Sequence, residues 1–288
     1  MAFDLIHRHN ENATALTMAQ LQEQCPAAFS DHAAPETSDR YGFVSTASAI
    51  EILLDNGFEP VRAIQKPSRK NESALFNDHM ITFNAPKLYD GAGERGELIL
   101  YNSHNARSSL KLFAGAFRFI CSNGIVAGEG FQAKLRHSKL TANNFDALVQ
   151  EQAQALPDLL DRIENLKTVA WDKERVLNFA YNAASLRWEL DPNATVSETT
   201  EWESLRGSYA NNQTFNDMNT ARRYGDNGAD AWRVFNRVQE SLIRGGVRIR
   251  SYTEKTPYGK QRTARPIAAL SETVRVNRKL WDMADALA

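Results

Sequence analysis

Residues 101–109 (Tyr-Asn-Ser-His-Asn-Ala-Arg-Ser-Ser) gather hydrogen-bonding side chains and one cation behind a predicted strand. Binding and catalytic residues often lie in polar loops of this kind. His104, with Asn102 nearby, has the side chain of a general base, and Arg107 has that of an anion-binding group. Asn, Ser and His are also common turn residues. The segment therefore indicates either a hydrolase or nuclease cluster of His104, Asn102 and Arg107 or a hydrogen-bonded hairpin loop.

Cys121 lies at the end of an apolar run a few residues further along the chain. A thiolate next to an imidazole is a nucleophile, so Cys121 is a candidate catalytic residue that His104 or His79 would activate. A free cysteine is equally a small buried hydrophobe, and this structural role stays open. Arg118 in the same segment is a second candidate anion-binding side chain, in addition to Arg107.

The segment 244–265 is basic and alternates arginines with β-type residues. Arg248 and Arg250 are two residues apart, so both point to one face if the segment is a strand. Guanidinium groups pair with phosphates, and tyrosine rings stack on unpaired bases. The candidate nucleic-acid-binding residues are Arg244, Arg248, Arg250, Tyr252, Tyr258, Lys260, Arg262 and Arg265. A solvated hairpin that pairs with the chain's own carboxylates, or with another protein, explains the same pattern.

The charge of the chain is unevenly distributed. The formal net charge is -1, which is no global signature of a polyanion binder. From Arg233 to Lys279, however, twelve basic residues stand against three acidic ones, a local balance of +9, so the rest of the chain carries about −10. This asymmetry favours polyanion binding by the basic segment or its neutralisation by the acidic part of the protein.

Several classes of site find no support in the sequence. There is no Walker loop, no Gly-x-Gly-x-x-Gly and no His-Glu-x-x-His. The two cysteines and six histidines are scattered, so no zinc site and no disulfide framework is predicted, and no cofactor is identified. No apolar run reaches the roughly 20 residues that cross a bilayer, and no secretory signal is visible. We expect a cytoplasmic protein with no membrane partner.

The chain has 288 residues, of which 42% are hydrophobic and 24% are charged. This length and composition suggest one large or two modest globular domains. A helix is predicted over 45–57, with Ser45 or Thr46 as N-cap and Gly57 at the C-terminal end. A short helix over 17–24 ends before Pro26. Strands are predicted at 58–66, 79–85, 97–103, 109–114 and 116–121. Gly115 indicates a turn or bulge, and Asn123-Gly124 indicates a hairpin turn.

From Asn143 onward the apolar residues recur at helical spacing. The predicted helices are 143–167 with a break or kink at Pro157, 172–188, 229–244 and a last one capped by Ser271. Residues 191–225 are expected to form a long connection. The fold class is therefore α+β, with an N-terminal, mostly antiparallel sheet and a flanking helix, followed by a C-terminal helical part with a basic hairpin. We expect a polar arm over 1–40, the sheet over 41–140, and a helical part over 141–288, with its basic segment at 244–266, packed on the sheet as one unit.

Several stretches together resemble a known family. They are Asn102–Ser109, the block 115–124, the segment 230–246, and Thr263–Ile267 followed by 274–281. Over about residues 40–285 the chain resembles the phage- and plasmid-associated family called domain of unknown function 932. Asn105-Ala106 departs from the Asp-Gly expected there. The resemblance implies a phage, prophage or plasmid setting and no particular activity.

Three functions are compatible with these observations, and the sequence does not decide whether the chain is an enzyme. The first is a mobile-element accessory protein that binds DNA or RNA in recombination, annealing or replication support. The second is a hydrolase or nuclease that uses His104, Asn102 and Arg107. The third is an interaction protein, directed at a host factor or at host defence, whose basic segment docks on an acidic surface. The oligomeric state is left open.

Overall fold

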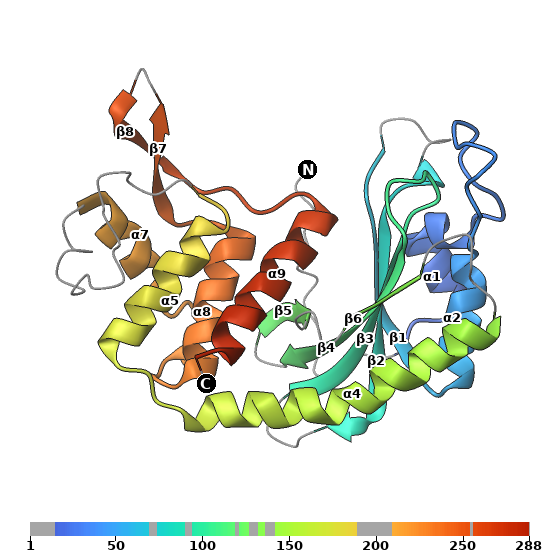
Figure 1. Cartoon of the computed structure of the whole chain (residues 1–288), viewed down its shortest axis with the longest axis horizontal. Coiled ribbons are helices and arrows are strands. Elements are labelled where there is room, and N and C mark those ends of the chain that lie inside the picture. Colours follow the sequence, from blue (N-terminus) through green and yellow to red (C-terminus); the bar gives the residue numbers. More distant parts are fainter. Residues whose placement is uncertain are drawn as a thin grey trace. The chain divides into compact units, whose positions relative to one another are not determined.

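The computed structural model describes residues 15–68, 74–89, 94–118, 121–126, 132–135, 142–188, 209–253 and 256–287. The described residues form two compact units, with the boundary between Asp161 and Arg162. The first unit contains a sheet with helices, and the second contains helices with a small hairpin (Figure 1). The predicted α+β fold class is confirmed.

The sheet of the first unit is antiparallel throughout its described strands. These are β1 (Glu59–Gln65), β2 (His79–Tyr89), β3 (Glu94–Asn102), β4 (Leu110–Arg118), β5 (Cys121–Val126) and β6 (Gln132–Leu135). Strands β1 to β5 follow one another in space as they do in sequence. Strand β6 pairs with the first half of β4 and β5 with the second half, so the two short strands share one edge of β4.

Helix α2 (Thr46–Asp55) forms as the sequence predicts. The Ser45 hydroxyl accepts a hydrogen bond from the Ser48 amide and caps the helix, and Gly57 adopts a φ of 82° just after its end. Ile50 and Leu53 point into the core and are fully buried. Helix α1 (Met18–Gln24) and the 3-10 turn η1 (Pro26–Phe29) lie near α2 and β1, and Figure 1 shows α1 and α2 on the same side of the sheet.

Two turn predictions in the sheet are wrong. Gly115 lies inside β4, which is one continuous strand where the sequence suggested two. Asn123 and Gly124 lie inside β5, whose first residue, Cys121, already pairs with Arg118 of β4. The register of β4 and β5 shifts between Phe117 and Arg118, so the irregularity lies beside Gly124. Strand pairing, with β3 and β5 at Gly115 and with β4 at Gly124, outweighs the local turn preference of these residues.

The boundary between the two units falls within α4 (Ala142–Thr168), which continues through Pro157 without the predicted break. The second unit contains α5 (Lys173–Ser185), α7 (Tyr209–Asn219), the 3-10 turn η4 (Tyr224–Asp226), α8 (Ala231–Arg244) and α9 (Leu270–Asp285). Helix α7 occupies part of the expected long connection, and residues 191–208 lie outside the described residues. Ala269, not Ser271, is the N-cap position of α9.

Helix α8 is the centre of the second unit. All of its residues from Ala231 to Ile243 are buried except Arg233, and α5, α7 and α9 pack around it. Trp232 stacks on Phe235, with ring centroids 5.5 Å apart, and Phe235 meets Trp281 of α9 edge to face. Polar residues on a helix buried this completely need partners within the protein, which explains the arginine and carboxylate network described below.

A two-stranded hairpin follows α8, formed by β7 (Arg248–Thr253) and β8 (Thr256–Thr263). Gly245 and Gly246 connect it to α8 with φ values of 69° and 80°. A Cβ atom on Gly245 would lie 2.4 Å from the Ala264 carbonyl oxygen, so only glycine fits at this crossing. The predicted basic hairpin is therefore present, and glycine is required where the chain leaves α8 to enter it.

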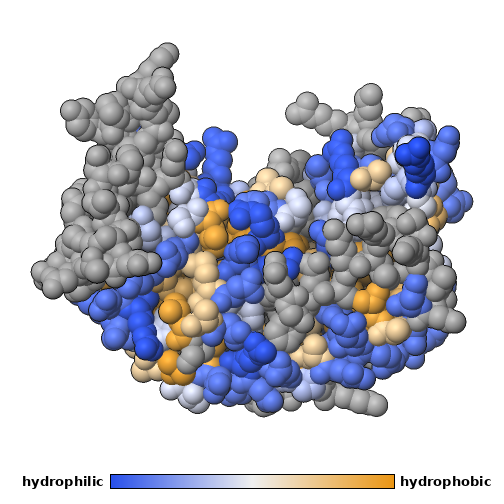
Figure 2. Space-filling model, in the orientation of Figure 1, coloured by the Kyte–Doolittle hydropathy of each residue, from blue (hydrophilic) through white to orange (hydrophobic). Residues whose placement is uncertain are grey.

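No helix in the described part of the chain has the length and apolar character needed to span a membrane. On the face drawn in Figure 2, hydrophilic residues dominate the described surface and separate smaller hydrophobic areas.

Candidate functional site

Residues 103–109 form the loop between β3 and β4. The Ser103 hydroxyl accepts from the Ser108 amide at 3.0 Å, and the Asn105 carboxamide accepts from the Arg107 amide at 3.2 Å. Ala106 has a φ of 60°, which is the left-handed conformation that glycine adopts more easily. This position is one of the two where the chain departs from the expected Asp-Gly, so the backbone explains why glycine would be favoured.

Four buried side chains meet behind this loop, and we call Thr46, His79, Asn102 and His104 the Thr46 cluster. All four have 0% exposure. The Thr46 hydroxyl lies 2.8 Å from Nε2 of His79, 3.3 Å from Nε2 of His104 and 2.9 Å from Nδ2 of Asn102. The first residue of α2, the start of β2 and the end of β3 are thus tied together by one hydroxyl group.

The hydrogen bonds assign the protons of this cluster. Nδ1 of His79 lies 2.8 Å from the Asn77 carbonyl oxygen, which can only accept, so Nδ1 carries a proton. Burial lowers the pKa of His79 to about 4, against the raising effect of that backbone bond, so the ring is neutral at pH 7. Its Nε2 then accepts from the Thr46 hydroxyl, whose oxygen accepts from the Asn102 amide.

The cluster brings together two of the predicted catalytic residues, His104 and Asn102, and adds Thr46 and His79. The aromatic ring of Phe43 packs on His104 with centroids 4.9 Å apart, and the Ala34 amide donates to the His104 carbonyl at 2.8 Å. Because no side chain of the cluster reaches the surface, the arrangement holds α2 against the sheet and gives a substrate no access. The Arg107 side chain is exposed on the loop and belongs to no ion pair with a described residue.

Cys121 does not join this cluster. Along β3 and β4, Tyr101 pairs with Lys111 at one end and Glu94 with Arg118 at the other, and Arg118 pairs in turn with Cys121. At roughly 3.3 Å per residue, the two ends of this ladder lie about 23 Å apart. His104 follows the end that carries Tyr101, so Cys121 and Arg118 are placed away from His104 and Arg107. The side chains of Cys121 and Arg118 lie outside the described residues.

Part of the positive charge of residues 233–279 is neutralised by carboxylates of the second unit. Arg248 of β7 donates to both carboxylate oxygens of Asp217 of α7, at 2.9 and 2.6 Å, and these bonds hold the pKa of Asp217 below its usual value. Glu272 and Arg275 form a similar pair on α9 at 2.6 Å. Arg233 pairs with Asp230, the N-cap residue of α8, at 2.6 Å.

Glu240 of α8 is the most enclosed of these carboxylates. Its side chain is 5% exposed, and one of its oxygens, Oε1, accepts from Arg223 and from Arg244, both at 3.0 Å. Arg244 is four residues further along the same helix, whereas Arg223 comes from the segment before it. Two arginines therefore share one buried negative charge, and Arg244 is not a freely exposed cation.

Three predicted nucleic-acid-binding residues are exposed and lack the carboxylate partner that the exposed Arg248 has: Lys260 and Arg262 of β8, and Arg265 just after it. None of them has an ion pair with a described residue. Lys260 and Arg262 are two residues apart on one strand and share a face, opposite Ser251 and Ile249 of β7. The side chains of Arg250, Tyr252 and Tyr258 lie outside the described residues.

A further cation lies near this surface. Arg187, at the end of α5, donates to the carbonyl oxygens of Leu242 and Arg265 and so ties α5 to both ends of the hairpin connection. Burial lowers the pKa of the Arg187 guanidinium, Glu272 raises it, and the charge of Arg262 lowers it again. The charge of Arg187 is therefore felt near both Glu272 and Arg262.

Comparison with known proteins identifies the family to which the chain belongs. The chain belongs to the family described as domain of unknown function (DUF932), whose model matches residues 35–281. One family model therefore covers both compact units. The chain is similar to the UPF0380 protein YafZ of Escherichia coli (strain K12), with 28% identity over 277 residues, which cover 94% of this chain and 91% of YafZ. It is also similar to the UPF0380 protein YfjQ of the same strain, with 27% identity and the same coverage. No solved structure matches the chain significantly.

Proposed function

We propose that this protein is a nucleic-acid-binding accessory protein of mobile genetic elements, which contacts phosphates through Lys260, Arg262 and Arg265. The observation that carries the proposal is the exposure of these three cations without a carboxylate partner among the described residues. They belong to β8 and the residues just after it, and Arg187 adds positive charge near Arg262. The mobile-element setting rests on the resemblance to phage and plasmid proteins.

The physical basis is the pairing of guanidinium and ammonium groups with phosphate oxygens, which releases counterions from the nucleic acid. Since Arg244, Arg248 and Arg275 are engaged with Glu240, Asp217 and Glu272, the proposed contact surface is smaller than the local balance of +9 suggests. We therefore expect few phosphate contacts, modest affinity and no base-specific readout by the cations themselves.

The hydrolase or nuclease alternative is less well supported, because it needs a substrate to reach His104 and Asn102, and both have 0% exposure. The interaction-protein alternative uses the same cations as the nucleic-acid proposal, with carboxylates of a partner in place of phosphates. A binding experiment with nucleic acid separates the two.

The test is fluorescence anisotropy of labelled single-stranded and duplex oligonucleotides, titrated with the full chain over a range of salt concentrations. We expect binding at low salt whose logarithmic affinity falls linearly with the logarithm of salt concentration. The double variant Lys260→Glu/Arg262→Glu should lose roughly 10-fold or more in affinity, and Lys260→Ala should reduce the salt slope by about one contact.

The matched control is Arg40→Glu/Lys66→Glu, which makes the same change in net charge at two cations of the first unit that have no ion pair with a described residue. It should leave the affinity within about 2-fold of the unmodified chain, because long-range charge effects are screened at moderate salt. Absence of any binding at low salt would overturn the proposal and leave the acidic-partner alternative.

A further inference from the structure

Tyr224 is an exposed aromatic residue that no pattern in the sequence distinguishes. Its side chain is 96% exposed, whereas the other exposed large hydrophobic residues among those described, including Met18 and Leu75, are no more than 39% exposed. The aromatic rings around α8, such as Trp232 and Phe235, are buried. Exposed apolar side chains are common singly, but a tyrosine ring with almost no contact with its own protein is unusual enough to need a reason.

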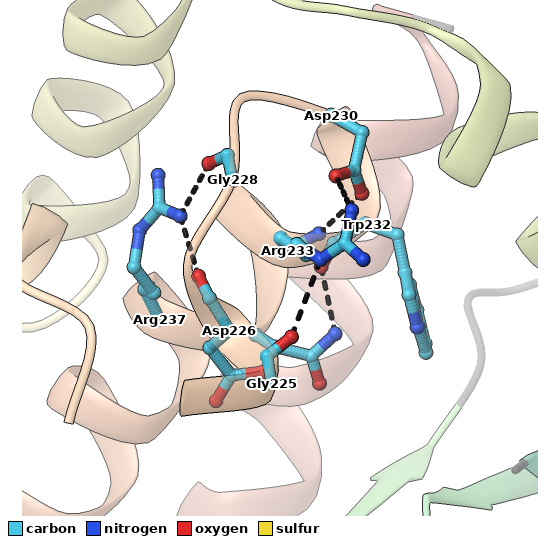
Figure 3. A network of polar contacts seen from close by, with 8 residues as sticks. Gly225, Asp226, Gly228, Asp230, Trp232, Arg233 and Arg237 are labelled. Carbon is cyan, nitrogen blue, oxygen red and sulfur yellow. Dashed lines mark hydrogen bonds and ion pairs between the residues drawn. The ribbon is translucent and has the colours of Figure 1, made fainter. Parts of the chain in front are cut away.

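The segment that carries Tyr224 is held firmly along α8. Arg237 of α8 donates to the carbonyl oxygens of Asp226 and Gly228, both at 2.7 Å, and Arg233 donates to the Gly225 carbonyl at 3.3 Å (Figure 3). Arg237 is largely buried, and this desolvation lowers its pKa while Asp226 raises it. The ring is therefore presented to solvent by a turn whose backbone is fixed on both sides, so little conformational entropy is lost when a ligand orders it.

The same segment leads to the basic hairpin. Arg223 donates to Glu240, and Arg222 donates to the Gly245 carbonyl oxygen at 2.6 Å, at the point where the chain leaves α8 for the hairpin. The residues just before Tyr224 are thus tied to the C-terminal end of α8, and those just after it are tied to Arg233 and Arg237.

The hairpin connection also brings the proposed phosphate-binding surface to this point. The Gly246 amide donates to the Ala264 carbonyl at 2.8 Å, so Gly245 and Gly246 pack directly against the chain at Ala264 and Arg265. Arg222, two residues before Tyr224, places its guanidinium group against Gly245 and Gly246 and so links the Tyr224 turn to the hairpin connection. A backbone-binding cation and an exposed ring within a few nucleotides' reach are the two elements of a single-strand binding surface.

We infer that Tyr224 stacks on an unpaired base of a single-stranded nucleic acid whose phosphates lie on the surface of Lys260, Arg262 and Arg265. The inference rests on the proposed function and adds the substrate class to it: single strands rather than duplexes. The bases of a duplex are stacked on each other and offer no free face to an isolated ring, whereas every base of a single strand does. Recognition by one stacked ring is tolerant of sequence.

The test measures the affinity of Tyr224→Ala and Tyr224→Trp for a labelled oligo-dT single strand, a mixed-sequence RNA strand and a DNA duplex. We expect Tyr224→Ala to weaken binding to single strands by about 5- to 100-fold and Tyr224→Trp to retain or improve it. Binding to the duplex should change by less than about 2-fold, because it depends on the cations alone. The salt slope for single strands should stay unchanged in Tyr224→Ala, since no charge is removed, and this separates stacking from a general loss of the surface.

The matched control is Asn227→Ala, which removes another exposed side chain from the same turn. It should bind the two single strands and the duplex like the unmodified chain. Thermal unfolding should show that all three variants are folded. If the unmodified chain binds no oligonucleotide, the proposed function and the inference both fail. If it binds and Tyr224→Ala binds single strands equally well, or loses duplex and single-strand affinity alike, only the inference is overturned.

Discussion

The Thr46 cluster of the first unit and the Glu240 network of the second are both polar, but they differ in charge and in contact with water. In the cluster, uncharged hydrogen bonds join Thr46, His79 and Asn102, all with 0% exposure. In the network, Glu240 is almost fully enclosed while Arg223 and Arg244 remain about one fifth exposed. The first arrangement stabilises the fold without any contact with solvent, whereas the second leaves two partly exposed cations around one enclosed carboxylate. Polar density in a sequence therefore marks a site only when some of it stays accessible.

The largest effect is expected where a buried charge would lose its partner. Glu240→Ala leaves Arg223 and Arg244 without their shared carboxylate, and breaking a pair of this kind costs about 3–5 kcal/mol of unfolding free energy. Urea denaturation measures the loss. Asp217→Ala, which removes the carboxylate partner of the half-exposed Arg248, is the control and should cost about 1 kcal/mol. Equal losses in the two variants would contradict the distinction between enclosed and exposed pairs.

The second prediction concerns pH and the Thr46 cluster. The pKa of His79 is lowered from 6.5 to about 4 by burial, so between these values the unfolded chain binds a proton that the folded chain does not. The contribution of neutral, buried His79 to the unfolding free energy is fully present above about pH 6.5. It is lost as the pH falls through 4, by roughly 3 kcal/mol in all. Urea midpoints over that range measure it. His79→Gln should flatten the dependence, and an unchanged slope would show that other groups dominate.

A smaller loss is expected when the hydroxyl at the centre of the cluster is removed. Thr46→Val keeps the volume but leaves Asn102 and His79 without their common partner, at a cost of about 2–3 kcal/mol. Thr46→Ser retains the hydroxyl and should cost about 1 kcal/mol. Because the cluster is buried and uncharged, the difference in unfolding free energy between Thr46→Val and Thr46→Ser should not change in high salt. The difference between Asp217→Ala and the unmodified chain should shrink.

The smallest effect is expected in the loop that follows the cluster. Ala106 holds a left-handed conformation with φ of 60°, so Ala106→Gly should raise the unfolding free energy by about 0.5–1 kcal/mol. Thermal unfolding measures the gain. The same change in a helix, Ala153→Gly in α4, should have the opposite sign and cost about 1 kcal/mol. A loss in both variants would show that position 106 tolerates alanine without strain.

Features of the fold that depend on residues close together in the sequence could be predicted. The limits of α2 depend on Ser45 and Gly57, which act on their immediate neighbours, and they were predicted within a residue or two. The pairing of Glu240 with Arg244 is also local, because residues four apart meet on one helix face. The turn at Asn123-Gly124 failed because strand pairing outweighs a local preference.

The rest depends on contacts between distant parts of the chain. Thr46, His79 and Asn102 meet only because the register of β2 on β3 places His79 opposite Asn102, beneath the first turn of α2. The pairing of Arg248 with Asp217 likewise requires α7, which the composition of its segment did not indicate. The exposure of Tyr224 depends on a turn anchored by Arg237, and no pattern of residue types reveals that.

The way the sheet is bordered has a consequence for handling the protein. On one border, β4 is covered by two short strands placed end to end; on the other, the Pro60 carbonyl of β1 accepts from the Leu16 amide, and Pro60 itself has no amide proton to offer. Among the described residues, one border consists of strands of only six and four residues, and the other carries a proline. Short border strands and an edge proline both limit pairing with a strand of a second molecule, so concentrated samples should scatter little light.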